Sequence, residues 1–353
     1  MAFTLNELGW GPHFENQVSD AEKQQFRLAR VAAHFGSQVL MLTERGELHV
    51  PTAILENEKL PFVSSSSSVA VGDWYLVTKK DGRAIRQLDR KTLIARKAPG
   101  EEVKTQLIAS NVDSVFVVSS CNQDFNPSRL ERYLALVLES GATPIVVLTK
   151  ADLGEDGRAF RREAESLHAG VLVETLDARD PDQTQVLDYW CSIGKTVALV
   201  GSSGVGKSTL ANTMGGFDLR TQSIRQDDDK GRHTTTARSM HRLRSGGWLV
   251  DTPGMRELQV ADCEDAVSHL FDDVLAVAQK CRFRNCRHDG DSGCAIDEAI
   301  KTGELDHRRF KSYQKLLSEQ ARNRESLADR RAKDRKTGKL YKSIIQDKRN
   351  RRY

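Results

Sequence analysis

Short apolar runs alternate with polar stretches along this 353-residue chain, and their lengths and spacing differ between regions. Between about residues 27 and 97, segments such as QVLMLTERGELHV and VAVGDWYLVTKK alternate apolar and polar positions and are separated by Gly, Asp and Ser. This pattern is typical of short antiparallel strands. We expect a small all-β domain here, built as a five-stranded barrel, with the five-serine run at 64–68 as a flexible loop.

From about residue 110 to 275 the pattern changes to that of an α/β fold. Asn126 and Pro127 supply the cap and first-turn residue of a helix that follows the first apolar run. Runs of the length expected for parallel strands buried on both faces are SVFVVSS (114–120), PIVVLT (144–149), GVLVET (170–175), TVALVG (196–201) and GWLVDT (247–252). After a cysteine cluster, residues from about 305 to 324 read as helical, so the last domain should be mostly helical.

These sequence patterns divide the chain into five parts. We expect an extension (1–29), a small β-barrel domain (30–100), an α/β domain (101–275), a helical domain that carries the cysteine cluster (276–330) and a basic tail (331–353). The tail holds ten Lys or Arg against two Asp, although the whole chain carries only +4. Such a tail is either a solvated terminus or an arm for a polyanion such as RNA.

Composition narrows the class of protein. With 39% hydrophobic and 29% charged residues, the chain is typical of globular proteins. No apolar run approaches the ~18–20 residues of a membrane span, and the amino terminus lacks an apolar signal core. We therefore expect a cytoplasmic protein with no membrane partner. No heptad pattern is sustained, which favours a monomer.

One loop matches the pattern that cradles phosphates. Gly201 is followed by four residues and then by Gly206, Lys207 and Ser208, after an apolar strand and before a helix. Backbone N–H groups would face the phosphates, Lys207 would add a charge, and Ser208 would hold Mg²⁺. The nucleotide-binding residues expected here are Gly201, Ser202, Ser203, Gly204, Val205, Gly206, Lys207, Ser208 and Thr209.

Two downstream segments add to this site. Asp251 ends an apolar strand and is followed by Pro253 and Gly254, so Asp251 would bind Mg²⁺ and the Gly254 amide would sense the γ-phosphate. Between the two motifs lies a polar loop, QDDDKGRHTTTARS. Its threonine run offers Thr234 and Thr235 as switch ligands of Mg²⁺.

The stretch VVLTKADL, which precedes the phosphate loop, resembles a guanine-reading loop. The Asp152 carboxylate could accept from the two N–H donors of guanine, Lys150 could lie along the base, and Thr149 could cap the loop. A backbone amide near Leu176 could serve the guanine carbonyl. Since ligand-binding loops gather at the carboxyl edge of an open parallel sheet whatever their order in the chain, the motif order predicts a circularly permuted GTPase.

Three of the six cysteines are grouped with a histidine. Cys281, Cys286, His288 and Cys294 fall within fourteen residues and could fill a tetrahedral site. Three thiolates and one imidazole favour a closed structural Zn²⁺, one per chain. The alternatives are redox disulfides or free thiols.

These motifs together resemble the RsgA (YjeQ/YloQ) family of small-ribosomal-subunit-dependent, circularly permuted GTPases. The permuted order, the GRHTTT loop and the cysteine cluster carry the resemblance over about residues 30–320. It implies a barrel that docks on small-subunit rRNA and a role late in small-subunit assembly, ending with release after GTP is hydrolysed to GDP. Thr149 departs from the asparagine that most GTPases have there.

Hydrolysis needs a group that orients water, and Met255 occupies the position where Ras-like enzymes have glutamine. An imidazole can orient a water, so His233 is the catalytic candidate, and the resemblance implies the same role. We expect the small subunit to stimulate turnover.

The RNA-binding hypothesis for the barrel rests on a basic, aromatic stretch. Its residues are Arg83, Arg86, Arg90, Lys91, Arg96 and Lys97, with Trp74 and Tyr75 nearby as stacking aromatics, which would suit an OB fold that binds RNA. The alternative is a solvated sheet face, with Trp74 in the core. Two other functions stay open: a GTP-dependent binding switch on another RNA or protein with little turnover, and a P-loop kinase or ATPase, in which Asp152 would have no role.

Overall fold

The computed structural model describes residues 2–55, 69–97, 105–152, 157–216, 238–251 and 263–321. The chain divides into two compact units: Met1–Arg96 with Thr105–Gln259 (unit 1), and Lys97–Lys104 with Val260–Tyr353 (unit 2). Within the described ranges, no helix has the length and apolar character to cross a membrane. The predicted features outside these ranges are the serine run at 64–68, His233, Thr234, Thr235, Gly254, Met255 and the tail 331–353.

The α/β half of unit 1 is built on the strands that the apolar runs predict. They are β8 (Ser114–Ser120), β9 (Thr143–Thr149), β10 (Leu172–Thr175), β11 (Thr196–Gly201) and β13 (Trp248–Asp251). These pair in parallel in the order β10-β9-β8-β11-β13, and β12 (Arg238–Arg242) adds an antiparallel strand beside β13. All of β8 is buried, because helices cover both faces of the sheet.

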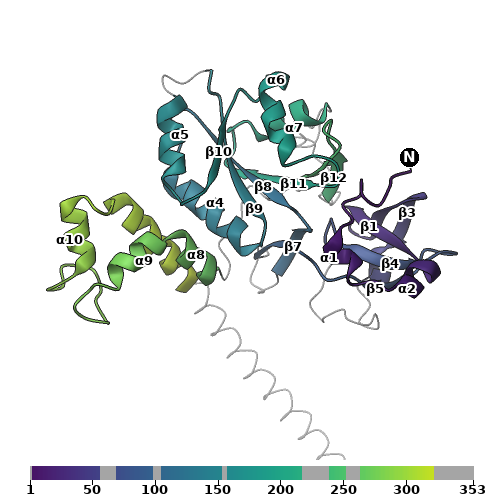
Figure 1. Cartoon of the computed structure of the whole chain (residues 1–353), viewed down its shortest axis with the longest axis horizontal. Coiled ribbons are helices and arrows are strands. Elements are labelled where there is room, and N and C mark those ends of the chain that lie inside the picture. The colour runs from purple at the N-terminus through teal and green to yellow at the C-terminus, as the bar shows by residue number, and fades with distance from the viewer. Residues whose placement is uncertain are drawn as a thin grey trace, which may run out of the picture. The chain divides into compact units, whose positions relative to one another are not determined.

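Helices lie on the two faces of this sheet. They are α4 (Pro127–Glu139), α5 (Gly157–Glu165), α6 (Pro181–Thr184), the 3₁₀ helix η1 (Gln185–Tyr189) and α7 (Lys207–Gly215). Figure 1 shows α4 and α5 on one side and α7 on the other. The Asn126 side chain accepts from the Arg129 amide at 3.0 Å, so α4 begins with the predicted cap. Phe116 and Ile145 pack with Leu210 of α7 in one core.

The amino-terminal strands form an antiparallel set. They are β1 (Phe26–His34), β2 (Gln38–Thr43), β3 (Gly46–Pro51), β4 (Trp74–Thr78) and β5 (Ala84–Gln87), with short helices α1 (Pro12–Glu15), α2 (Asp20–Gln25) and α3 (Thr52–Leu55). Their order is β3-β2-β1-β4-β5, while β6 (Leu93–Lys97) pairs only with β7 (Thr105–Ser110). Among the residues described, no ladder joins β3 to β5, so closure into a barrel stays a prediction.

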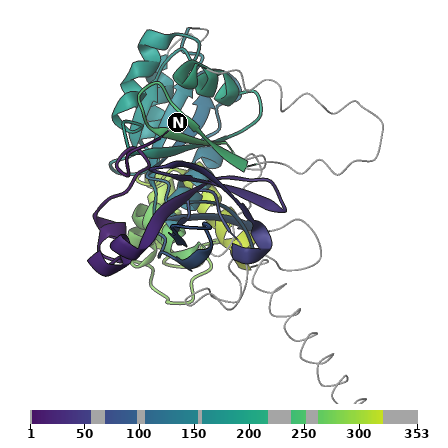
Figure 2. The same cartoon turned by 90° about the vertical axis from the view of Figure 1, so that its right-hand side faces the viewer.

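The two halves of unit 1 share a continuous sheet and an amino-terminal strap. β1 pairs with β12, with Ala33 opposite Ser239. The strap, residues 3–8, runs beside β12 and β13 in both views (Figures 1 and 2). There the Glu7 carboxylate accepts from Arg242 at 2.6 Å, and the indole N–H of Trp248 donates to the Glu7 carbonyl at 2.7 Å. The strap also contacts the amino-terminal strands, because the Leu8 carbonyl accepts from Arg30 of β1, so a segment from which the sequence predicted little joins both halves.

Arg30 of β1 is the most deeply placed charge in this junction. It is 2% exposed and donates to the Leu8 carbonyl at 2.6 Å, to the Thr196 hydroxyl at 2.9 Å and to the Asn111 carbonyl at 3.2 Å. Burial lowers the pKa of Arg30 to about 10, so its guanidinium is still charged at neutral pH. Because Thr196 begins β11, one side chain fixes the strap, β1 and the central strand of the sheet.

The predicted base-stacking role of Trp74 and Tyr75 is wrong. Both side chains are buried, at 0% and 1% exposure. An alternating strand with one solvated face would expose one of them, but Trp10 and Phe14 cover the second face, with ring centroids 5.1 Å and 5.6 Å from Trp74. Three of the predicted cations of this stretch also form ion pairs within the protein: Arg90 with Asp73, Arg86 with Glu22 and Lys91 with Asp113.

Unit 2 is helical, as predicted. It contains α8 (Glu264–Leu270), α9 (Asp272–Ala278), α10 (Ala295–Thr302) and helical residues 307–321. Arg309 donates to both carboxylate oxygens of Asp273 at 2.6 Å and 2.7 Å and to the Leu270 carbonyl at 2.8 Å. Its guanidinium also lies 4.7 Å from the centroid of the Phe271 ring. The last helix is thereby held against α8 and α9.

Replacing Arg30 by methionine should destabilise unit 1. The Arg30→Met side chain fills similar volume but leaves the three acceptors without their charged donor, which should lower the free energy of unfolding by about 3 kcal/mol or more. Urea unfolding followed by Trp fluorescence measures this. The control is Arg161→Met, which removes an exposed arginine paired with Glu165 at 2.8 Å. Equal stability of the two variants would contradict the joining role of Arg30.

Candidate functional site

The phosphate loop lies between the end of β11 and the start of α7. Gly201, Gly204 and Gly206 have positive φ angles of 142°, 80° and 93°, which glycine adopts without strain. Gly201 is also restricted by space, because an added Cβ would lie 2.2 Å from the Val118 carbonyl oxygen of β8. The spacing of glycines in the sequence thus reflects both the turn and the close approach of a neighbouring strand.

The loop presents backbone and small polar groups to solvent. Ser203, Gly204, Ser208 and Thr209 are exposed, whereas the Val205 side chain is buried in the core under α7 and offers only its backbone. The Lys207 ammonium folds over the loop, donating to the Gly201 carbonyl at 2.8 Å and to the Ser202 carbonyl. With the amino terminus of α7 directly behind it, this loop can bind an anion.

Thr149 connects the base-reading loop to the phosphate loop. It ends β9, is fully buried, and its hydroxyl lies 2.6 Å from the Val205 carbonyl and 3.1 Å from that of Ser119. The side chain predicted to take part in nucleotide binding therefore faces the backbone of the phosphate loop. Threonine can stand here in place of the asparagine of most GTPases, because its single hydroxyl donor is enough to reach the Val205 carbonyl.

The residues after β9 and β10 come together as the sequence predicts. Lys150 has a φ of 58°, and the Asp152 side chain is 32% exposed and accepts from Arg179 at 2.7 Å. The Leu176 amide itself donates to the Leu148 carbonyl at 2.9 Å and so extends the ladder, and the predicted amide near Leu176 stays a prediction. Ala178, two residues on, has an amide with no acceptor within the described ranges.

The last acidic residue of the site lies at the same edge. Asp251 ends β13, whose Val250 is in register with Ala198 of β11. The carboxyl ends of β9, β10, β11 and β13 therefore face one edge, with the base-reading loop earlier in the chain than the phosphate loop. This is the circularly permuted order that the motifs predict.

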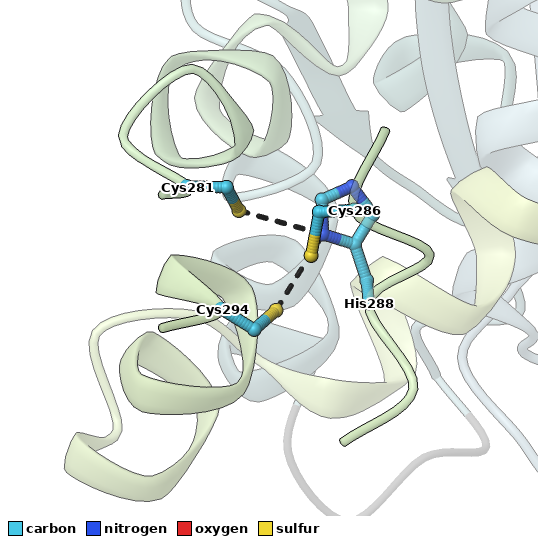
Figure 3. A group of neighbouring side chains, drawn as sticks. All are labelled: Cys281, Cys286, His288 and Cys294. Atoms are coloured by element: carbon cyan, nitrogen blue, oxygen red, sulfur yellow. Dashed lines mark hydrogen bonds between the residues drawn. The ribbon is translucent and has the colours of Figure 1, made fainter. Parts of the chain in front are cut away.

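A second cluster lies in unit 2, in the loop between α9 and α10 (Figure 3). The ligand atoms of Cys281, Cys286, His288 and Cys294 all lie within 4.8 Å of one another. His288 Nδ1 is 3.6 Å from Cys281 Sγ and 3.5 Å from Cys294 Sγ. A tetrahedral ion with Zn–S of about 2.3 Å and Zn–N of about 2.0 Å would separate these atoms by about 3.5 Å, so the four residues could hold a metal ion.

The backbone around this cluster is arranged for thiolates. The Ala295 amide donates to Cys281 Sγ at 3.3 Å, and the Asp297 amide donates to Cys294 Sγ at 3.4 Å. His288 has a φ of 57°, which turns its ring toward the sulfurs, and its ring lies edge-on to Phe310 at 5.9 Å. All six cysteines are free, so the disulfide alternative is not realised in this structure.

Comparison with known proteins identifies the family. The model of the RsgA GTPase family matches residues 87–261. The small ribosomal subunit biogenesis GTPase RsgA 2 of Vibrio parahaemolyticus is 47% identical over 98% of this chain and 94% of its own length. The chain belongs to the RsgA GTPase family. The small ribosomal subunit biogenesis GTPase RsgA of Mesorhizobium japonicum is 43% identical over 91% of each chain.

Two solved structures share the fold of this chain. YjeQ from Thermotoga maritima superposes with a TM-score of 0.58 at 25% identity, covering 83% of this chain and 98% of its own. YloQ, described as a circularly permuted GTPase, gives a TM-score of 0.57 at 22% identity, covering 86% and 97%. The RsgA GTPase match includes both the base-reading and phosphate loops, and the Vibrio relative extends through the cysteine cluster.

Removing the Thr149 hydroxyl should loosen the nucleotide site of this RsgA family member. Thr149→Val keeps the shape but loses the bond to the Val205 carbonyl, so guanine nucleotide affinity should fall by about tenfold, the value of one buried hydrogen bond. Titration with a fluorescent GDP analogue measures this, with Thr149→Ser as the matched control that keeps the hydroxyl. Equal affinities for the two variants would contradict a connecting role.

Proposed function

We propose that this chain is a GTP hydrolase that binds the small ribosomal subunit, acts late in its assembly and leaves after hydrolysis. The observation that carries the proposal is the meeting of Asp152, the phosphate loop and Asp251 at one sheet edge. The curated relatives, named as small ribosomal subunit biogenesis GTPases, support the ribosomal part. A ribosomal role would place the protein in the cytoplasm of a bacterium.

The geometry supports specific contacts with GTP. Asp152 would accept from the guanine N1 and N2 groups, the Lys150 stem would lie along the base, and the Ala178 amide would donate to the guanine carbonyl. The amides of residues 202–208 and the Lys207 ammonium would surround the phosphates. Ser208, exposed on the first turn of α7, and Asp251 at the end of β13 would hold Mg²⁺, whose charge would stabilise the phosphates.

Hydrolysis is assigned to a residue outside the described ranges. Met255 follows the DTPG motif and cannot orient a water, so His233 remains the proposed catalytic residue, with Thr234, Thr235 and Gly254 as the switch contacts. His233 precedes the threonines directly, which would bring it near the γ-phosphate once they close over Mg²⁺. Dependence on a ribosomal surface would follow if that surface orders the loop.

The other parts are proposed to bind the subunit. We keep an OB-type barrel at 30–100, a GTPase domain at 101–275, a zinc-binding domain at 276–330 and a basic tail. With Trp74 and Tyr75 buried, the barrel would contact rRNA through phosphates rather than by stacking. Arg83 is exposed and suits this role.

The metal of the second cluster is proposed to be zinc, because three thiolates and one imidazole suit Zn²⁺ and leave no open position. Purified protein should contain one zinc per chain by elemental analysis, and Cys294→Ser should contain much less. The matched control is Cys121→Ser, which changes the buried cysteine directly after β8. Full zinc content in Cys294→Ser would contradict the assignment.

GTP hydrolysis tests the main proposal. Turnover should rise about 10²-fold or more when isolated small subunits are added, and large subunits are the control. His233→Ala should bind GTP normally but lose most of this stimulation. Stimulation by both subunits, or by neither, would contradict small-subunit dependence.

A GTP-dependent binding switch with little turnover is the second candidate, and Met255 in place of a glutamine is the observation that favours it. The same assay separates the two functions. Tight GTP binding without stimulated turnover, and with His233→Ala unchanged, would favour the switch.

A further inference from the structure

Arg179 joins two carboxylates on neighbouring loops of the nucleotide edge. Arg179 and Asp177 lie on the loop after β10, and Asp152 lies on the loop after β9. The Nη2 atom of Arg179 donates to Asp152 at 2.7 Å and to Asp177 at 2.9 Å. Its Nε atom donates a further bond to Asp177 at 3.0 Å. The ion pair with Asp177 is bidentate, whereas the ion pair with Asp152 uses one carboxylate oxygen.

The Asp177 end of this bridge is held by the fold. The Asp177 carboxylate also accepts from the Arg179 amide at 2.9 Å, and the Asp177 amide donates to Gln183 at 2.9 Å. The carbonyl of Ala178, between them, accepts from Thr213 of α7 at 2.7 Å. The loop that carries the guanidinium is therefore tied to the helix of the phosphate loop.

The two carboxylates are close enough to repel each other without Arg179, because both lie within hydrogen-bond distance of the same nitrogen. The hydrogen bonds from Arg179 lower the pKa of Asp177, so Asp177 is ionised at neutral pH. An ionised neighbour would push the Asp152 carboxylate away. That movement would misplace an acceptor that must face two N–H donors.

We propose that Arg179 is a positioning residue that holds Asp152 ready to read guanine by bridging it to Asp177. The proposal rests on the proposed GTP site. An ionised carboxylate has about four lone-pair sites on two oxygens, and the only described contact of Asp152 uses one site on Oδ2. Guanine N1 and N2 can therefore bind while Arg179 stays in place.

The bridge should also determine how well the site distinguishes guanine from hypoxanthine. Guanine offers N1–H and the 2-amino group, whereas hypoxanthine offers only N1–H. A fixed carboxylate binds both donors of guanine, while one that can swing gains less from the 2-amino group. The affinity ratio of GDP to IDP therefore reports on the orientation of Asp152, which a general loss of stability would not change.

The test compares the binding of GDP and IDP by calorimetry to the full-length protein, Arg179→Met, Arg179→Met/Asp177→Ser and the control Arg161→Met. In Arg179→Met the GDP-to-IDP affinity ratio should fall by about tenfold, the share of one charge-assisted hydrogen bond. The double variant, which removes the repelling carboxylate as well, should recover most of the ratio. Arg161→Met should match the unmodified protein.

Three results would overturn the inference. An unchanged ratio in Arg179→Met would make the ion pair a surface contact only, and tighter GDP binding would show that Arg179 blocks the base site. A ratio that the double variant does not recover would exclude the neutralising role. Failure of the unmodified protein to bind either nucleotide would instead overturn the GTP site itself.

Discussion

The buried guanidinium of Arg30 is the constraint on which the rest of unit 1 depends. A charge removed from water is costly unless its donors find acceptors, and Arg30 donates to acceptors from the strap, from residue 111 and from Thr196. None of these three segments can move away without leaving the charge unsatisfied. The amino-terminal strands and the central strand of the nucleotide sheet are therefore fixed relative to each other. Because Thr196 begins β11, the strand that leads into the phosphate loop is held in place at its first residue.

Around that loop, side-chain hydrogen bonds connect neighbouring loops and helices of the site. Thr149 reaches the Val205 carbonyl, Thr213 of α7 reaches the Ala178 carbonyl, and Arg129 of α4 donates to the Ser202 hydroxyl at 2.8 Å. Each contact crosses from one loop or helix to another. The edge of the sheet is thus organised before a nucleotide arrives, which lowers the entropy that binding must overcome.

The sequence predicts best those strands that are buried on both faces. β8 and β11 have helices on both faces, so an apolar run identifies them, and the glycine spacing identifies the phosphate loop. The prediction for Trp74 and Tyr75 was wrong because the strand pattern does not reveal that Trp10 and Phe14, some sixty residues earlier in the chain, cover the second face. The sequence could not say which amide near Leu176 is available, because the ladder runs one residue beyond β10 and includes the Leu176 amide. Arg30 and Arg179 gave no signal, because a single arginine has no periodicity.

The pairing of β1 with β12 joins residues that lie more than two hundred positions apart, Ala33 with Ser239. Strand pairs of such long sequence separation form late, because most of the intervening chain must be ordered first. During synthesis the base-reading loop emerges before the phosphate loop, yet the sheet cannot be completed until β12 and β13 have followed. Ala33 and His34 of β1 therefore stay without their β12 partners until Arg238 and Ser239 have been synthesised, and a folding chaperone would have this short strand edge to protect during that period.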